Sequence, residues 1–139
     1  MVDHAPMTIV ALDGVDEREA TINVAGPAAL MVSKLHKLGE RQVDPGRLVD
    51  KDAHDLYRLL VAAETMELAA RFDALAADEL AGVVTRRALA YLRELFSSAG
   101  SGLGATMAGR AEELVGDPAV VTVAATALAD DLLDALSRT

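Results

Sequence analysis

The chain has 139 residues and a formal net charge of −9; 52% of its residues are hydrophobic and only 3% are aromatic. This length matches one folded domain, and this apolar content is enough for a core, which excludes a disordered chain. With so few aromatic rings and no Trp, the core must be built from Ala, Leu, Val and Met, which favours packed helices over a β-sandwich. We therefore predict a single, mainly α domain over residues 1–139, with a short hairpin in 1–25 and five or six helices in 26–139.

Cysteine is absent, which excludes disulfides and thiolate metal sites and favours a cytoplasmic protein. The most apolar run, residues 119–129, is too short and too rich in Thr to span a bilayer, so we expect no membrane anchor. The acidic charge argues against general nucleic-acid binding, because phosphate contacts need clustered Lys and Arg.

Two β-type runs open the chain, residues 7–12 and 20–24, on either side of the turn-rich string Asp13-Gly14-Val15-Asp16. This arrangement predicts an antiparallel hairpin. An isolated hairpin is barely stable in water, so it needs helices packed on it or a sheet to join.

Gly26-Pro27 opens a predicted helix that runs to about Gly39, because Pro is tolerated in a first turn. Asp44-Pro45-Gly46 marks a turn, and Asp50 is the expected N-cap of a second helix over residues 51–63.

Apolar spacing predicts four more helices. They cover residues 65–77, a segment capped by Asp78 that ends near 96, a short piece near 105–114, and 118–136. The last is apolar almost all round, and together with the unpaired hairpin edges this predicts at least a homodimer. The methionines Met31, Met66 and Met107 are expected to fill the core.

Positive charge is concentrated in residues 26–58, the one segment in which cations outnumber acids. It holds every Lys and two of the three His, His36 and His54. The three His are not spaced as ligands on one helix, so no metal site is predicted, although His36 could line a cleft.

Two polar stripes stand out within this segment. On the first helix, three cations lie at positions i, i+3 and i+7: Lys34, Lys37 and Arg41. On the second helix, three charged residues follow at intervals of three: Asp52, Asp55 and Arg58. If the helices pack as antiparallel neighbours, the two Lys face the two Asp across a cleft suited to a triphosphate. The alternative is two solvated helix faces, with Lys51 and Asp55 as an ordinary i, i+4 pair.

Two strings in this segment resemble the carboxyl-terminal half of AbiEii-type nucleotidyltransferases, which include MenT-type toxins. The first is Gly26-Pro27-Ala28-Ala29-Leu30, leading into Lys34-Leu35-His36-Lys37 and Arg41. The second, similar to a Lys-Asp-x-x-Asp-Leu signature, is Lys51-Asp52-Ala53-His54-Asp55-Leu56-Tyr57-Arg58-Leu59-Leu60. The string Asp3-His4-Ala5-Pro6-Met7 also resembles a strand entry upstream in such proteins. The resemblance covers roughly the first half of the chain.

The resemblance implies a site that holds Mg²⁺ and a nucleoside triphosphate in a complete family member. It assigns Lys34, or Lys37 in its place, to a phosphate and Asp55 or Asp52 to the downstream acid. The neighbouring nucleotide-binding residues would be Lys37, Arg41, Lys51, Asp52 and Arg58. An RNA acceptor is implied in the same way.

The chain departs from the family in one respect: it has no Gly-Ser element followed by Asp-x-Asp. Two-metal phosphoryl transfer needs those carboxylates. We therefore expect a truncated, split or degenerate nucleotidyltransferase that is inactive alone and is completed by a catalytic half or bound by an antitoxin partner. The competing hypothesis is a non-catalytic helical interaction or regulatory module that retains the family scaffold.

Overall fold

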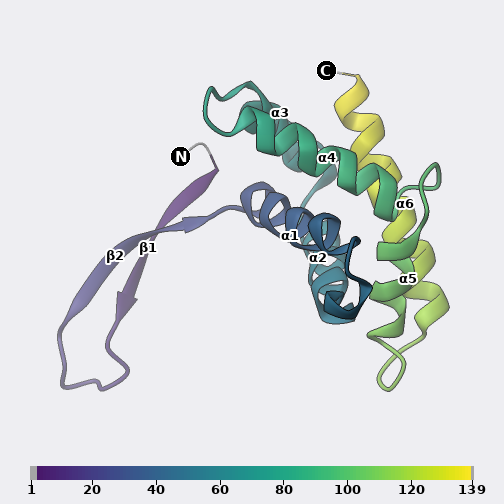
Figure 1. Ribbon diagram of the computed structural model, residues 1–139. Helices are drawn as coiled ribbons and strands as arrows, with labels where there is room; N and C mark the ends of the chain where they lie inside the picture. The colour runs from purple at the N-terminus through teal and green to yellow at the C-terminus, as the bar shows by residue number, and fades with distance from the viewer. Residues whose placement is uncertain (1–2, 139) are drawn as a thin grey trace.

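A two-stranded antiparallel hairpin precedes six α-helices in the computed structural model, which describes residues 3–138 (Figure 1). Strand β1 (His4–Val10) pairs with β2 (Glu19–Ala25) in a register that sets His4 opposite Ala25 and Val10 opposite Glu19. The mainly α fold with an N-terminal hairpin is thus confirmed. The first strand lies earlier than predicted, because the pairing reaches back through Pro6, which an edge strand tolerates.

Asp3 anchors the hairpin to the helices. Its carbonyl accepts the Gly26 N–H at 2.9 Å, and its carboxylate accepts the Ala29 N–H at 2.8 Å and a bond from Arg71 Nη1 at 2.8 Å. A Cβ on Gly26 would lie 2.1 Å from Asp3 Oδ1, so the close approach requires glycine there. The base of the hairpin is therefore tied to α1 and α3.

The six helices and one 3₁₀ turn follow in order. They are α1 (Pro27–Arg41), η1 (Pro45–Arg47), α2 (Asp50–Ala62), α3 (Thr65–Ala77), α4 (Gly82–Phe96), α5 (Leu103–Arg110) and α6 (Pro118–Ser137). Side-chain caps fix two of the starts: Glu64 accepts the N–H groups of the first turn of α3, and Asp117 does the same for α6.

The core lies among the helices. α1 packs against α4 and α2, α5 packs against α2 and α6, and α3 packs against α6. The largest fully buried side chains are Phe72, Phe96, Met31, Leu35, Leu38, Leu56, Leu68, Leu92, Leu95, Met107 and Leu132. Within the described residues, no helix has both the length and the apolarity to cross a membrane.

Four local predictions were wrong. Asp78 does not cap α4, which begins at Gly82; its carboxylate accepts the N–H groups of Leu80 and Ala81 in the preceding turn. Asp50 is the first residue of α2 rather than its N-cap, and its carboxylate bonds to Arg110 instead of capping. α5 starts at Leu103, after Gly102 turns the chain with φ of +70°, and it ends at Arg110. Met66 is 58% exposed, because it lies on the outer face of α3.

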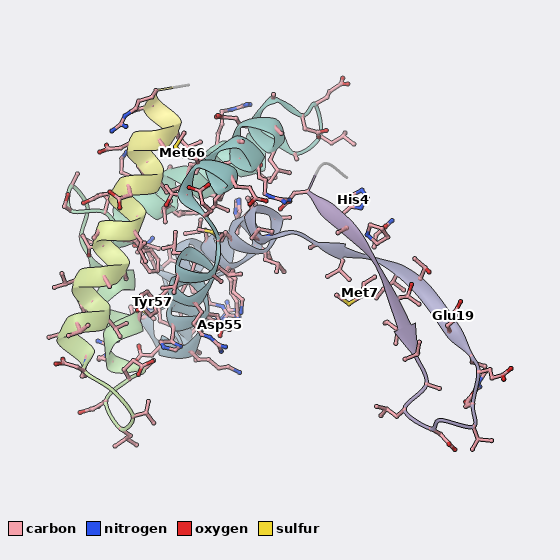
Figure 2. The ribbon with its side chains drawn as sticks, turned by 180° about the vertical axis from the view of Figure 1, so that it is seen from behind. His4, Met7, Glu19, Asp55, Tyr57 and Met66 are labelled. Atoms are coloured by element: carbon pink, nitrogen blue, oxygen red, sulfur yellow. The ribbon has the colours of Figure 1, made fainter. Side chains whose placement is uncertain are left out.

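The hairpin projects away from the helical body, so the two form the arms of an open V (Figure 1). Seen from behind, Met7 lies on the side of the hairpin that faces the helices, and Glu19 lies on the far side (Figure 2). The hairpin face that carries Met7 is thus turned toward the notch, the open space between the two arms of the V.

Candidate functional site

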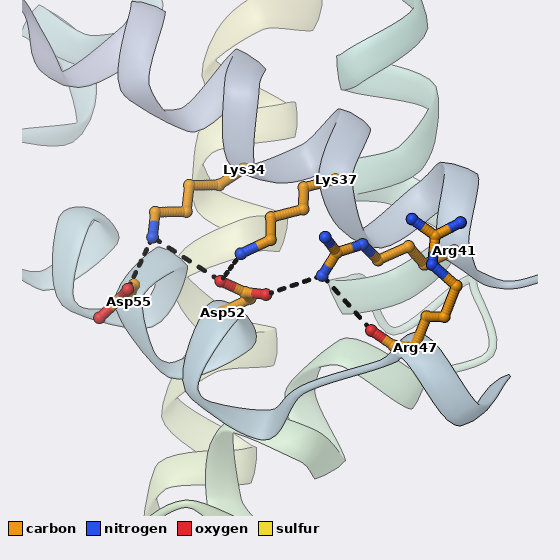
Figure 3. Close-up of polar contacts among 6 residues, drawn as sticks. All are labelled: Lys34, Lys37, Arg41, Arg47, Asp52 and Asp55. Carbon is orange, nitrogen blue, oxygen red and sulfur yellow. Dashed lines mark hydrogen bonds and ion pairs between the residues drawn. The ribbon is translucent and has the colours of Figure 1, made fainter. Parts of the chain in front are cut away.

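The polar stripes of α1 and α2 face each other. Lys34 Nζ donates to Asp55 Oδ2 at 2.6 Å, and Lys37 Nζ donates to Asp52 Oδ1 at 2.6 Å (Figure 3). The spacing brings this about because apolar neighbours on each helix, such as Leu35 on α1 and Leu56 on α2, are fully buried between them. The expected juxtaposition of two Lys and two Asp is therefore present in the structure.

Asp52 is the centre of the cluster. Its side chain is only 8% exposed, yet three cations surround it: Lys37 at 2.6 Å, Arg41 at 3.5 Å and Lys34 at 3.9 Å. Arg41 Nη1 also donates to the carbonyl of Arg47 at 3.3 Å, which connects the cluster to η1 (Figure 3). A buried carboxylate is costly unless it is paired, so the three cations offset the burial of Asp52 and are held in place around it.

Asp55 lies at the more open end. The pKa of the Asp55 carboxyl is lowered, mainly by the hydrogen bond from Lys34. Burial of Asp55 acts in the opposite direction, and the positive charges of Lys34, Lys51 and Arg58 lower the pKa further. Asp55 is therefore ionised throughout the neutral range. Lys34 remains 30% exposed, so its ammonium group can be reached from solvent.

An open pocket of about 360 Å³ adjoins the Lys34–Asp55 pair. Its lining residues are Leu30, Lys34, Asp55, Arg58, Leu59 and Ala62. One wall is thus apolar and the other carries two cations, a combination that suits a ligand with a flat or apolar part and an anionic part. Leu30 and Leu59 were not identified from the sequence, although each lies four residues from a predicted site residue on the same helix face.

The other two predicted residues of α2 are Arg58, which lines the pocket, and Lys51, which lies outside its lining. Lys51 and Arg58 are exposed on α2, and within residues 3–138 neither has a carboxylate within ion-pair distance. The alternative i, i+4 pair between Lys51 and Asp55 is absent, because Asp55 pairs with Lys34 across the helices.

His36 does not line the cleft. Its ring bonds to Glu40 and to the carbonyl of Val84 and packs edge-on against Tyr91 of α4. It therefore faces the opposite side of α1.

The carboxylates of the cleft do not fit Mg²⁺. Asp52 and Asp55 are each occupied by ammonium or guanidinium groups, and a divalent cation would have to displace Lys34 and Lys37 at once. Nowhere in the described part of the chain do three His, Asp or Glu side chains come together as a metal site would need.

The cleft carries a net positive charge. Lys34, Lys37 and Arg41 outnumber the two carboxylates by one charge, and Arg58 adds another at the pocket. Comparison with protein-family models, with curated proteins and with solved structures finds no significant match for this chain.

Proposed function

We propose that this chain is the helical half of an AbiEii-like nucleotidyltransferase, and that it holds the phosphates of a nucleoside triphosphate or an RNA acceptor in the α1–α2 cleft. The catalytic carboxylates would come from another polypeptide. The observation that carries the proposal is the Lys34–Asp55 pair at 2.6 Å, partly exposed at the mouth of the pocket. A fully charged triphosphate can compete with one carboxylate for a solvent-accessible ammonium group.

Each residue has a separate role in this proposal. Lys34 contacts a phosphate, and Asp55 orients Lys34 when the ligand is absent. Asp52 stays buried and positions Lys37 and Arg41 beside the phosphates. Lys51 and Arg58, which are exposed and have no ion-pair partner among residues 3–138, extend the positive surface along α2. The pocket wall formed by Leu30 and Leu59 would contact the base or sugar.

The second candidate is a non-catalytic interaction or regulatory module, which the exposed hairpin favours. In that case the Lys–Asp pairs only tie α1 to α2, and no phosphate ligand binds. An antitoxin or a regulatory partner would then contact the chain elsewhere.

Calorimetric titration with ATP, GTP, CTP and UTP, without added metal, separates the two candidates. We expect weak binding of at least one triphosphate by the wild-type chain and loss of that binding in Lys34→Ala. Arg93→Ala is the matched control, because Arg93 is exposed on α4 and its loss changes the net charge equally. Flat traces for the wild type, or equal binding by Lys34→Ala, would overturn the proposal.

A further inference from the structure

The hairpin has one apolar face that nothing in the described structure covers. The register places Ala5, Met7, Ile9, Ala20, Ile22 and Val24 on one face. The opposite face is mostly polar and carries His4, Pro6, Thr8, Val10, Glu19, Thr21, Asn23 and Ala25. Val10 is its one large hydrophobic residue, and the hydroxyls of Thr8 and Thr21 lie 3.3 Å apart on it. Met7 is 54% exposed, Ile9 49% and Ile22 45%. A two-stranded ribbon in water is barely stable, so this face needs an occupant.

The outer edge of β1 is poorly suited to receive that occupant as an added strand. The bond from Ala11 N to the Arg18 carbonyl fixes which pairs in the ladder are hydrogen-bonded. Pro6 falls at an outward-facing position, where it supplies no N–H donor. We therefore expect the occupant to bind the apolar face of the hairpin rather than the edge of β1.

The face alone is too small for a stable complex. Seven residues on each of two strands give a footprint of roughly 200 Å² from the usual strand rise and spacing, whereas a stable interface needs about 800 Å² from each partner. The occupant must also contact the helical arm of the V.

The distribution of unpaired charges indicates which part of the occupant lies on the helical arm. Among the described residues, three acids at the free end of the hairpin, Asp13, Glu17 and Glu19, have no cation within ion-pair distance, because Arg18 is bonded to Asp16. Three exposed cations of η1 and α2 likewise lack a carboxylate: Arg47, Lys51 and Arg58. The hairpin end of one chain points away from its own α2 (Figure 1), so these two groups can meet only between chains.

We propose that a second copy of this chain occupies the notch, with the two V shapes interlocked about a twofold axis. The apolar hairpin faces pack against each other, and the acidic outer side and end of each hairpin lie on the η1–α2 cations of the other copy. Each hairpin is then covered on both faces, and the contact occurs twice, as a twofold dimer requires. This inference goes beyond the proposed function and does not depend on it; the dimer contact and the phosphate surface share Lys51 and Arg58, so a bound triphosphate would compete with the acids of the second copy.

Single-cysteine variants test this directly, because the natural chain has no Cys. Met7→Cys places a thiol on the apolar face, and Thr8→Cys places one on the opposite face of the same strand. Under mild oxidation we expect a disulfide-linked dimer of Met7→Cys and little of Thr8→Cys. Light scattering should show a wild-type dimer that Met7→Lys converts to monomer with an unchanged helical far-UV spectrum.

A charge exchange tests the second contact. Glu19→Lys and Arg58→Glu should each weaken the dimer by several-fold, and the double variant should recover most of the loss. A wild-type monomer at several hundred micromolar would overturn the proposal and leave the face to a different polypeptide. Equal cross-linking of Met7→Cys and Thr8→Cys would also overturn it, since the dimer would then use another surface.

Discussion

A single buried carboxylate near the amino terminus determines how the hairpin joins the helices. The side chain of Asp3 is 1% exposed and accepts bonds from both the first turn of α1 and Arg71. From the sequence alone Asp3 was only part of a resembling strand entry, because its two partners lie 26 and 68 residues away. A contact at that separation has no local periodicity that could predict it.

Asp3→Ala should lower the free energy of unfolding by about 1–3 kcal/mol, because it leaves the partly buried Ala29 N–H without its acceptor and removes one of the two carboxylates that Arg71 binds. Asp13→Ala is the control, since the exposed Asp13 side chain accepts only the Val15 N–H, and it should cost about 0.5 kcal/mol or less. Chemical denaturation measures both. Equal losses would show that Asp3 is not a structural anchor.

The stability that the Lys34–Asp55 ion pair contributes depends on pH, because Asp55 must be ionised for the pair to form. Because the folded state lowers the pKa of Asp55, the pair contributes stability above the unfolded value of about 3.9, and that contribution disappears as the pH falls through the lower folded value.

The unfolding free energies of the wild type and Lys34→Met should therefore differ by at most about 1 kcal/mol at pH 7, and the difference should vanish in acid. Denaturation curves between pH 7 and pH 2 measure it, with Arg93→Met as the control. A difference that persists unchanged in acid would mean that Lys34 acts through packing of its alkyl chain instead.

At the scale of the elements, local signals were sufficient where a cap or a proline marks a start. The predicted beginnings of α1, α3 and α6 agree with the structure, because Pro27, Glu64 and Asp117 act within one turn of the chain. The first strand and α5 differ from their predicted limits. Their bounds depend on strand register and on the packing of α5 against α2 and α6, which are long-range effects.

The contact of α1 with α4 depends on a glycine within a helix. A Cβ on Gly39 would lie 2.3 Å from the ring of Tyr91. Gly39→Ala should destabilise the chain by about 1–3 kcal/mol by overpacking, although Ala is the better helix former by about 1 kcal/mol.

Thermal unfolding tests this against Gly46→Ala, whose added Cβ would meet only an ordinary contact at 3.5 Å. A Gly39→Ala chain as stable as the wild type would mean that α1 and α4 can move apart at little cost.

For the whole molecule, the fold class followed from composition and apolar spacing, and the facing of α1 and α2 followed from their stripes. The sequence did not show that the hairpin extends from the helices rather than packing on them, because alternation identifies an apolar face without identifying its partner. The same limit holds for the site: spacing predicted which Lys and Asp meet, but not that Arg47 contributes a carbonyl.

Because the proposed function places the catalytic carboxylates on another polypeptide, we expect this chain to be inactive alone. Purified protein mixed with labelled nucleoside triphosphates, Mg²⁺ or Mn²⁺ and transfer RNA should transfer no label, because the sequence has no Gly-Ser element followed by Asp-x-Asp. Label transfer that follows this polypeptide through purification would show that other residues hold the metal ions.

The proposed function requires Lys34 to exchange its carboxylate partner for a phosphate. Carbon-13 NMR of the carboxyl groups, titrated with and without a saturating nucleoside triphosphate, tests it most directly. The pKa of Asp55 should rise toward its ordinary value when the ligand takes Lys34 and brings negative charge nearby. The pKa of Glu64, which is lowered by backbone N–H groups outside the cleft, should stay unchanged. An Asp55 pKa that does not move with the triphosphate present would mean that Lys34 keeps its carboxylate partner and binds no phosphate.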